Sequence, residues 1–212
     1  MTKPTPDSNE QSKAKVTTFK LLVDCTINNG WLSDIEHRPS PHFTSREPAQ
    51  DVSLLVVHNI SLPPGKFGGP YITDLFLGKL DPRQDSYFEE IYQLRVSAHC
   101  LIRRNGQVIQ YVSFDDKAWH AGVSDFNGRE KCNDFSIGIE LEGTDTEPYT
   151  EEQYQQLVCL VQKLQESYPL IVHNHLVGHC DIAPGRKTDP GEAFNWPYFK
   201  ALLNKGIIDG TN

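Results

Sequence analysis

The sequence feature that most constrains the fold is the apolar run SLLVVHNI at residues 53–60. Consecutive β-branched and apolar side chains are typical of a strand buried within a sheet. A second run, FSIGIELEG at residues 135–143, alternates instead, so that Ile139 and its apolar neighbours share one face. Glu140 then lies on the opposite face, away from the core. We therefore expect both runs to be strands of a central sheet.

A hairpin is predicted in SAHCLIRRNGQVIQYV, residues 97–112, where two strand-like runs flank Asn105 and Gly106. This dipeptide tolerates the positive φ angles of a type I′ turn. By contrast, GHCDIAPGRKTDPG at residues 178–191 is too rich in glycine and proline for a helix. Charged and turn-forming residues of this kind indicate a loop.

Helices are predicted from periodicity and capping residues. The longest covers residues 150–169, because Thr150 and Gln153 have capping-box spacing and apolar side chains then recur at helical intervals. A shorter helix is expected after Asn195. The sequence YITDLFLG, residues 71–78, indicates one more turn of helix.

The length of 212 residues suits one well-buried domain and is too short for two of full size. Residues 1–20 are polar and aperiodic, so we expect a flexible tail followed by a domain at 21–212. No apolar run approaches the ~20 residues that span a bilayer, and the first residues lack the apolar core of a secretory signal. The five cysteines form no CxxC pair, which favours reduced thiols. These features predict a cytoplasmic protein.

Five residues carry the candidate chemistry: His58, Glu140, His179, Lys187 and Asp189. Two imidazoles and a carboxylate form the ligand set that leaves a catalytic zinc ion one open position for water. Zinc lowers the pKa of that water to about 7. A carboxylate outside the ligand set, Glu140, can take its proton, and the cation of Lys187 can stabilise an oxyanion.

Four of these residues also have a plain structural explanation. His58 can be a hydrogen-bonded histidine at a strand end. Glu140 can be a solvated strand residue, and Glu142 on the same face is then its equal rival. Asp189 can start a turn, and Lys187 can be a solvated surface charge.

Five segments resemble a known family: SLLVVHNISLPPG, LRVSAHCLIRRNG, AWHAGVS, CNDFSIGIELEGTDT and GHCDIAPGRKTDPG. They are similar to the AmpD-type 1,6-anhydro-N-acetylmuramyl-L-alanine amidases, which are cytosolic members of the zinc N-acetylmuramoyl-L-alanine amidase family. The likeness runs from about Gly30 to about Phe199. It implies a single α/β domain, with a central mixed β-sheet flanked by α-helices and the metal at one edge of the sheet.

The resemblance also implies site residues and one zinc ion per chain. His58, His179 and Asp189 match the zinc ligands, Glu140 matches the catalytic acid, and Lys187 matches the lysine two residues before the last ligand. Asp189 in the sequence TDPG agrees with the AmpD type, because several other relatives carry cysteine at this position.

A further set is expected to bind substrate: Asn59, Arg95, Trp119, His120, Lys131 and Arg186. Trp119 and His120 are expected beside the sugar and lactyl group, although Trp119 can equally be a core residue. The formal charge of −8 means that an anionic stem peptide needs a local basic cluster, for which the two arginines and Lys131 are the candidates. Lys131 stands where the family leads us to expect arginine. All three cations can also be ordinary solvated charges.

The implied reaction is hydrolysis of the amide bond between 1,6-anhydro-N-acetylmuramic acid and the L-alanine of the stem peptide, during recycling of cell-wall fragments. The expected partner is a small anhydro-muropeptide, with no nucleic acid or membrane partner, and a monomer is favoured. Two alternatives stay open. The chain can be a non-catalytic module that binds peptidoglycan on the same fold, or an amidase that acts on intact cell wall.

Overall fold

The computed structural model describes residues 20–47 and 51–206. A six-stranded sheet forms its centre, in the order β12-β5-β11-β6-β7-β3. The first four of these strands run parallel, whereas β7 pairs antiparallel with β6 and parallel with β3. Its strands are β3 (Glu36–His37), β5 (Leu54–Ile60), β6 (Cys100–Ile102), β7 (Val108–Gln110), β11 (Ser136–Glu142) and β12 (Leu176–Gly178). The predicted central mixed sheet is confirmed.

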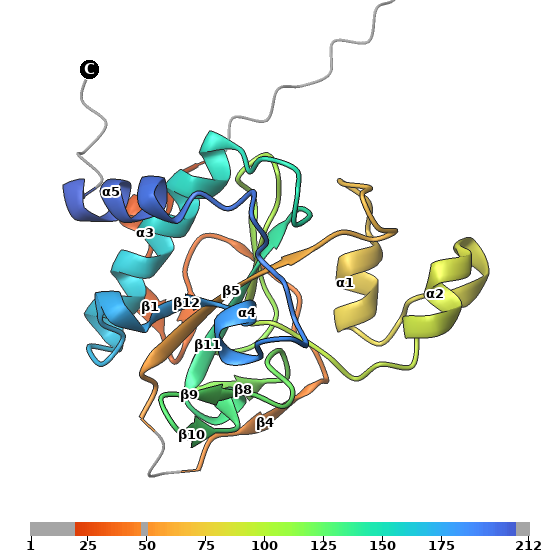
Figure 1. Ribbon diagram of the computed structural model, residues 1–212, viewed down its shortest axis with the longest axis horizontal. Helices are drawn as coiled ribbons and strands as arrows, with labels where there is room; N and C mark the ends of the chain where they lie inside the picture. Colours follow the sequence, from red (N-terminus) through yellow and green to blue (C-terminus); the bar gives the residue numbers. More distant parts are fainter. Residues whose placement is uncertain (1–19, 48–50, 207–212) are drawn as a thin grey trace, which may run out of the picture.

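Helices cover both faces of this sheet, as Figure 1 shows, with α3 and α5 together on one side and α1 and α2 on the other. The α-helices are α1 (Tyr71–Phe76), α2 (Ser86–Ile91), α3 (Glu151–Ser167), α4 (His179–Ile182) and α5 (Trp196–Lys205). Short 3-10 helices occur at η1 (Leu22–Asp24), η2 (Pro82–Gln84), η3 (Cys132–Asp134) and η4 (His173–His175). The flanking helices expected for an α/β domain are confirmed.

The alternation of side chains along β5 explains how two cores form on one strand. Leu55 and Val57 belong to the large core beneath α3 and α5. Leu54 and Val56 point to the other face, where they pack with Ile182 of α4. His58 continues this second set, so its side chain lies on the face that α4 covers.

Three two-stranded sheets lie beside the central one. β1 (Ile27–Asn28) pairs with β2 (Trp31–Leu32), β4 (Phe43–Ser45) with β8 (Asp116–Ala118), and β9 (Asp125–Phe126) with β10 (Arg129–Glu130), all antiparallel. The β9–β10 turn precedes η3, which leads directly into β11.

The helix predictions agree with the structure. In α3, Thr150 and Gln153 form the predicted capping box, with each side chain bonding the other's backbone N–H. The helix at α5 follows Asn195, whose side chain accepts a hydrogen bond from Tyr198 N. The turn of helix expected at residues 71–78 is α1. Helix α2, capped by Asp85, was not predicted.

The hairpin of β6 and β7 is confirmed, but its turn type is not. Gly106 has a φ of 80°, whereas Asn105 is not among the residues of positive φ in the described chain, so the turn is not type I′. Instead Gly106 N donates to Arg103 O (2.9 Å), and Arg103 N donates to Gln107 O (2.9 Å). These bonds define a three-residue loop that needs a left-handed residue only at its last position.

Two other expectations need correction. All seven residues of β11 are buried, so Glu140 does not face away from the core into solvent. Both faces of this strand are covered, and the alternation only separates two buried faces. The segment 178–191 is not entirely a loop, because one helical turn, α4, begins at His179. Asp181 starts this turn by accepting a hydrogen bond from Gly178 N (2.7 Å).

All five cysteines are free, as predicted. The predicted tail, residues 1–20, lies outside the described residues except for Lys20. Where the structure describes the chain, it contains no helix with the length and apolar character needed to cross a membrane.

Candidate metal centre

The carboxyl ends of two neighbouring parallel strands bring His58 and His179 together. His58 lies near the end of β5, and β12 ends at Gly178, immediately before His179. Because Gly178 pairs with Val57, the two imidazoles become neighbours, with ring centroids 4.5 Å apart and ring planes at 71°. Both side chains are buried.

Asp189 reaches the same point from the loop that follows α4. Cys180 N donates a hydrogen bond to Asp189 O (3.0 Å), which holds the loop against the first turn of α4. The Oδ2 atom of Asp189 lies 3.0 Å from His58 Nδ1 and 3.1 Å from His179 Nδ1, and the two Nδ1 atoms are 3.0 Å apart. Burial favours a higher pKa for Asp189, but its close contacts with His179 and His58 outweigh this effect and lower the pKa. The carboxyl is therefore ionised at neutral pH.

The outer ring nitrogens show that this triangle fits a metal ion. His179 Nε2 lies 3.0 Å from Ala121 O, and since a carbonyl only accepts, Nε2 carries the hydrogen and Nδ1 carries a lone pair. His58 Nε2 lies 2.9 Å from His120 Nδ1, and His120 Nε2 lies 3.1 Å from Ser136 Oγ. A hydrogen on His58 Nε2 and another on His120 Nε2 satisfy these contacts. They leave a lone pair on His58 Nδ1. Two lone pairs and a carboxylate then face one another, and a cation stabilises that arrangement.

Burial keeps His58 in the form that binds metals. Desolvation lowers the pKa of its imidazole to about 4, although the nearby carboxylate of Asp189 opposes this effect. The ring is therefore neutral at pH 7. Among the described residues, His58, His179 and Asp189 are the one group of three or more such side chains arranged to hold a metal ion.

Glu140 stands beside this group as the register partner of His58 on β11. It is 9% exposed, and its Oε2 atom is buried without a hydrogen-bond partner among the described residues. Burial raises the pKa of the Glu140 carboxyl well above its ordinary value, the charge of Asp189 adds to the rise, and Lys187 opposes it. A carboxyl with a raised pKa is a stronger base than an ordinary glutamate, which suits a proton-accepting role.

Glu142 shares the face of Glu140 but has a different environment. Its carboxylate pairs with Arg103 (Nη1–Oε1, 3.1 Å) and accepts hydrogen bonds from Gly68 N (2.7 Å) and Arg104 N (3.2 Å). Glu142 thus joins the loop before α1 to the β6–β7 hairpin. The hydrogen-bond partners distinguish the two glutamates, whereas the alternation of side chains along the strand does not.

A cavity of about 380 Å³ opens over the metal-binding group. The predicted residues that line it are His58, Asn59, Trp119, His120, Glu140, His179, Lys187 and Asp189. An apolar wall that sequence reasoning missed completes it: Ile60, Leu62, Pro64, Leu75, Phe76, Tyr87, Ile91, Leu94 and Val96. Much of this wall comes from α1, α2 and the loops around them, where the sequence shows no pattern that links them to the catalytic residues.

Trp119 and His120 have different positions in this cavity. Trp119 is half-buried on the wall, stacks on His42 at 6.2 Å and donates from Nε1 to Thr44 Oγ1 (3.4 Å), so it is not a core residue. The ring of His120 lies behind His58 and against Gly138 of β11.

None of the three basic residues predicted to bind substrate lines the cavity. Among the described residues that line the cavity, Lys187 is a member, and Arg95, Lys131 and Arg186 are not. Arg95 and Lys131 are exposed. Arg186 donates to the backbone carbonyls of Ala121 (2.7 Å) and Val123 (2.6 Å), so its guanidinium holds the loop that contacts His179.

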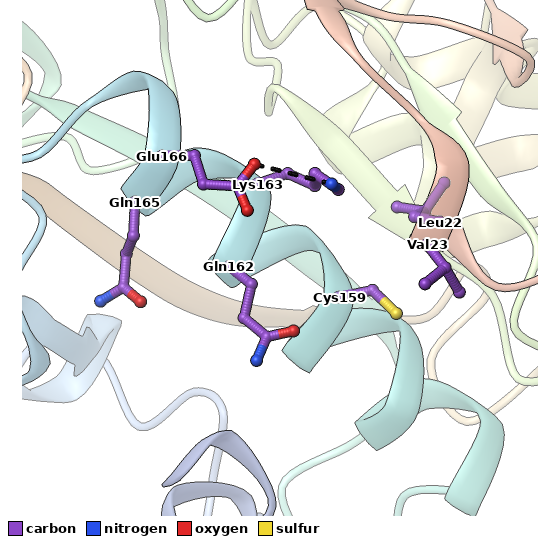
Figure 2. A pocket seen from close by; sticks show the side chains of 7 residues that line it. All are labelled: Leu22, Val23, Cys159, Gln162, Lys163, Gln165 and Glu166. Carbon is purple, nitrogen blue, oxygen red and sulfur yellow. Dashed lines mark ion pairs between the residues drawn. The ribbon is translucent and has the colours of Figure 1, made fainter. Parts of the chain in front are cut away.

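A separate hollow of about 510 Å³ lies between η1 and α3 (Figure 2). Its two charged groups, Lys163 and Glu166, pair with each other at 3.6 Å. The remaining lining consists of Leu22, Val23, Cys159, Gln162 and Gln165. Because the potential metal ligands and Glu140 lie elsewhere, we assign the chemistry to the cavity at His58.

The sequence matches known proteins over most of its length. The model of the N-acetylmuramoyl-L-alanine amidase family matches residues 48–192. The 1,6-anhydro-N-acetylmuramyl-L-alanine amidase AmpD of Salmonella typhimurium (strain SL1344) is 61% identical over 176 residues, which cover 83% of this chain and 94% of that protein.

Solved structures show the same relationship. The crystal structure of a selenomethionine AmpD derivative has a TM-score of 0.81 at 59% identity, covering 84% of this chain and 98% of the other. The amidase AmiD from E. coli, in complex with the substrate anhydro-N-acetylmuramic acid-L-Ala-D-γ-Glu-L-Lys, has a TM-score of 0.53 at 27% identity, covering 84% of this chain and 65% of the other.

Proposed function

This chain belongs to the N-acetylmuramoyl-L-alanine amidase family, and we propose that it acts with one zinc ion held by His58, His179 and Asp189. The enzyme hydrolyses the amide bond between 1,6-anhydro-N-acetylmuramic acid and the L-alanine of the stem peptide, in the recycling of cell-wall muropeptides. The observation that carries the metal proposal is the triangle of Nδ1, Nδ1 and Oδ2 atoms, 3.0–3.1 Å apart.

The donor set supports zinc as the metal. Two neutral imidazoles and one carboxylate, with room for a further ligand in the cavity, are typical of catalytic zinc sites. A tetrahedral zinc ion binds its ligands at about 2.0–2.1 Å, which corresponds to roughly 3.3 Å between ligand atoms. Lewis acidity, which lowers the pKa of water and polarises a carbonyl group, is the chemistry that zinc supplies when bound.

Glu140 moves the proton in this mechanism. Its carboxylate accepts a proton from the attacking water and then, as the neutral acid, donates it to the nitrogen of the leaving L-alanine. The raised pKa of Glu140 makes its carboxylate a stronger base toward the attacking water, and the acid that forms then carries the proton to the leaving nitrogen. Its unpartnered Oε2 atom faces no competing protein donor among the described residues.

Lys187 supplies positive charge at the same cavity. Attack on the amide carbonyl places negative charge on its oxygen, and a cation fixed beside that oxygen stabilises the transition state more than the ground state. Lys187 lies two residues before Asp189, so the loop that provides a metal ligand also provides this charge.

The substrate side of the proposal rests on the shape of the cavity. Trp119 presents an indole on the wall, where an aromatic face can pack on a pyranose ring, and His120 lies beside it. Asn59 lines the cavity with its amide bonded to Asp145 (2.8 Å). The exposed cations Arg95 and Lys131, together with Arg186, are proposed to attract the carboxylates of the stem peptide.

The proposed partner is a small anhydro-muropeptide bound to a monomer in the cytoplasm. The free cysteines agree with a reducing compartment. A purely binding module is disfavoured because the ligand group is complete and an unpartnered acid lies next to it.

One experiment tests the function against both alternatives. The zinc-loaded protein is incubated with anhydro-muropeptide and, separately, with intact sacculi, and the products are identified by mass. Release of free stem peptide from the anhydro-muropeptide alone is expected. Peptide release from sacculi at a comparable rate would support a wall-directed amidase instead, and binding without cleavage would support a recognition module.

A further inference from the structure

A backbone segment of two residues, His120 and Ala121, touches both metal-binding imidazoles. The side chain of His120 contacts His58 Nε2 (2.9 Å), and the backbone carbonyl of Ala121 accepts from His179 Nε2 (3.0 Å). The two contacts use consecutive residues, so a shift of this segment changes the orientation of both rings at once. The outer hydrogen bond of a metal-binding histidine fixes both its tautomer and its ring plane.

One side chain holds this segment in place. The Oδ1 atom of Asn133 accepts hydrogen bonds from both backbone amides, His120 N (3.1 Å) and Ala121 N (2.8 Å). The segment lies beyond the end of β8, which ends at Ala118, so strand pairing does not fix these two amides. Asn133 supplies the acceptor that a neighbouring strand supplies elsewhere.

Asn133 itself is held from the opposite side. It lies in η3, directly before β11, and its backbone carbonyl accepts from Arg46 Nη1 (3.0 Å). The same guanidinium bonds Asp134 O (2.9 Å) and Ser136 O (2.7 Å), so the chain around Asn133 is fixed to the start of the central strand. A continuous series of contacts therefore joins β11 to both imidazoles.

We propose that Asn133 is a positioning residue for the metal centre, which orients His58 and His179 together through the backbone of residues 120–121. This inference rests on the proposed function, because it assumes that both imidazoles bind the metal. Asn133 is not itself among the residues that line the cavity, and its side chain bonds the backbone of residues 120–121 rather than a metal ligand. It acts by holding the partner of each ring, and one acceptor atom serves both.

The test compares zinc affinity in the parent protein and three variants, measured by competition with a chelator under conditions where each is fully folded. Asn133→Ala removes the shared acceptor and is expected to weaken zinc binding about 10–100-fold, the usual effect of losing a partner of a metal ligand. Asn133→Asp keeps an oxygen at the same position and is expected to bind zinc nearly as tightly as the parent. Asn105→Ala is the matched control, because Asn105 also accepts a backbone N–H, from Gln107 (3.1 Å), but in the distant β6–β7 turn.

A second measurement separates positioning from general stability. In zinc-loaded protein, nitrogen-15 NMR follows the hydrogen on His179 Nε2, which is expected to exchange slowly in the parent and in Asn133→Asp, and rapidly in Asn133→Ala. A residue that only stabilises the fold would lower the free energy of unfolding and leave both the zinc affinity and this exchange rate unchanged.

Equal zinc affinity in the parent and Asn133→Ala would overturn the inference, as would equal weakening in Asn133→Ala and Asn133→Asp. If Asn133→Ala does not fold, Asn133→Ser replaces it, because the shorter hydroxyl cannot reach both amides. Failure of the parent itself to bind zinc would instead refute the proposed function, so the two failures are distinguishable.

Discussion

His58 and Glu140 are register partners on the parallel strands β5 and β11. The separation between the proposed metal-binding imidazole and the proposed proton-transfer acid is therefore set by the sheet itself, whose hydrogen bonds hold the two backbones side by side. Loops provide the remaining groups, Lys187 and Asp189. The most rigid part of the fold thus carries the pair whose relative position matters most for proton transfer.

Removing any one of the three metal ligands is expected to abolish zinc binding. A site with only three protein donors has none to spare, so His58→Ala, His179→Ala and Asp189→Ala should each lose stoichiometric zinc and all activity. Metal content after gel filtration is the measurement. His173→Ala is the control, because this exposed histidine of η4 lies outside the group and should leave zinc content unchanged. Full zinc content in all three ligand variants would refute the ligand set.

Glu140→Gln is expected to lower activity, whereas Glu142→Gln is expected to lower stability. Loss of the proton-transfer group should lower kcat by about 10²–10⁴-fold, with zinc content and substrate binding nearly unchanged. Glu142→Gln should instead lower the free energy of unfolding by about 1–3 kcal/mol, because it weakens the buried bonds to Arg103 and Gly68. Steady-state kinetics and urea unfolding of both variants check this. If excess zinc restores the activity of Glu140→Gln, the role of Glu140 is to strengthen metal binding and not to transfer the proton.

Trp119→Ala is expected to weaken substrate binding more than stability. Loss of the indole from the cavity wall should raise KM about tenfold, which corresponds to about 1.4 kcal/mol of binding, and change Tm little because the residue is half-buried. Trp31→Ala is the control, since Trp31 packs against His37 away from the cavity. A large drop in Tm with an unchanged KM would contradict the placement of the sugar beside Trp119.

Gly138→Ala is expected to weaken zinc binding by displacing the His120 ring. A methyl group at this position would overlap the His120 ring, which must then move away from His58. Overpacking of this kind costs about 1–3 kcal/mol of stability, and zinc affinity should fall with it. Gly69→Ala is a milder control, because its methyl group would meet only the side chain of Tyr71. Parent-like zinc affinity in Gly138→Ala would show that His120 does not support His58.

Sequence reasoning could find the elements whose signals are local. The apolar run of β5, the capping box of α3 and the Asn195 cap of α5 depend on neighbouring residues, and each is present in the structure. The resemblance supplied the metal-binding residues, which the sequence order alone could not bring together. It could not show that Glu142 is buried against Arg103, because that contact joins β11 to the hairpin loop after β6, far away in the chain.

Other features lack any sequence signal. Asn133 lies in a short 3-10 helix. The local sequence CND does not indicate that its side chain accepts hydrogen bonds from the backbone amides of residues 120 and 121. Similarly, the sequence around Arg186 is compatible with a solvated surface cation. In the structure, however, its guanidinium donates hydrogen bonds to two backbone carbonyls. In both cases the partner is a backbone atom, whose position depends on the tertiary fold and not on residue type.

The order of the metal ligands along the chain has a consequence for biosynthesis. When the ribosome has released the chain as far as α3, the nascent protein holds His58 and Glu140 but neither His179 nor Asp189. Strand β12, which brings His179 to the sheet, is also missing, so the edge of β5 is still open. Translation adds about 5–20 residues per second, so the last ligands follow within seconds. Until then the growing polypeptide lacks two of the three proposed zinc ligands, and the proposed site is complete only after the last strand of the described sheet has docked.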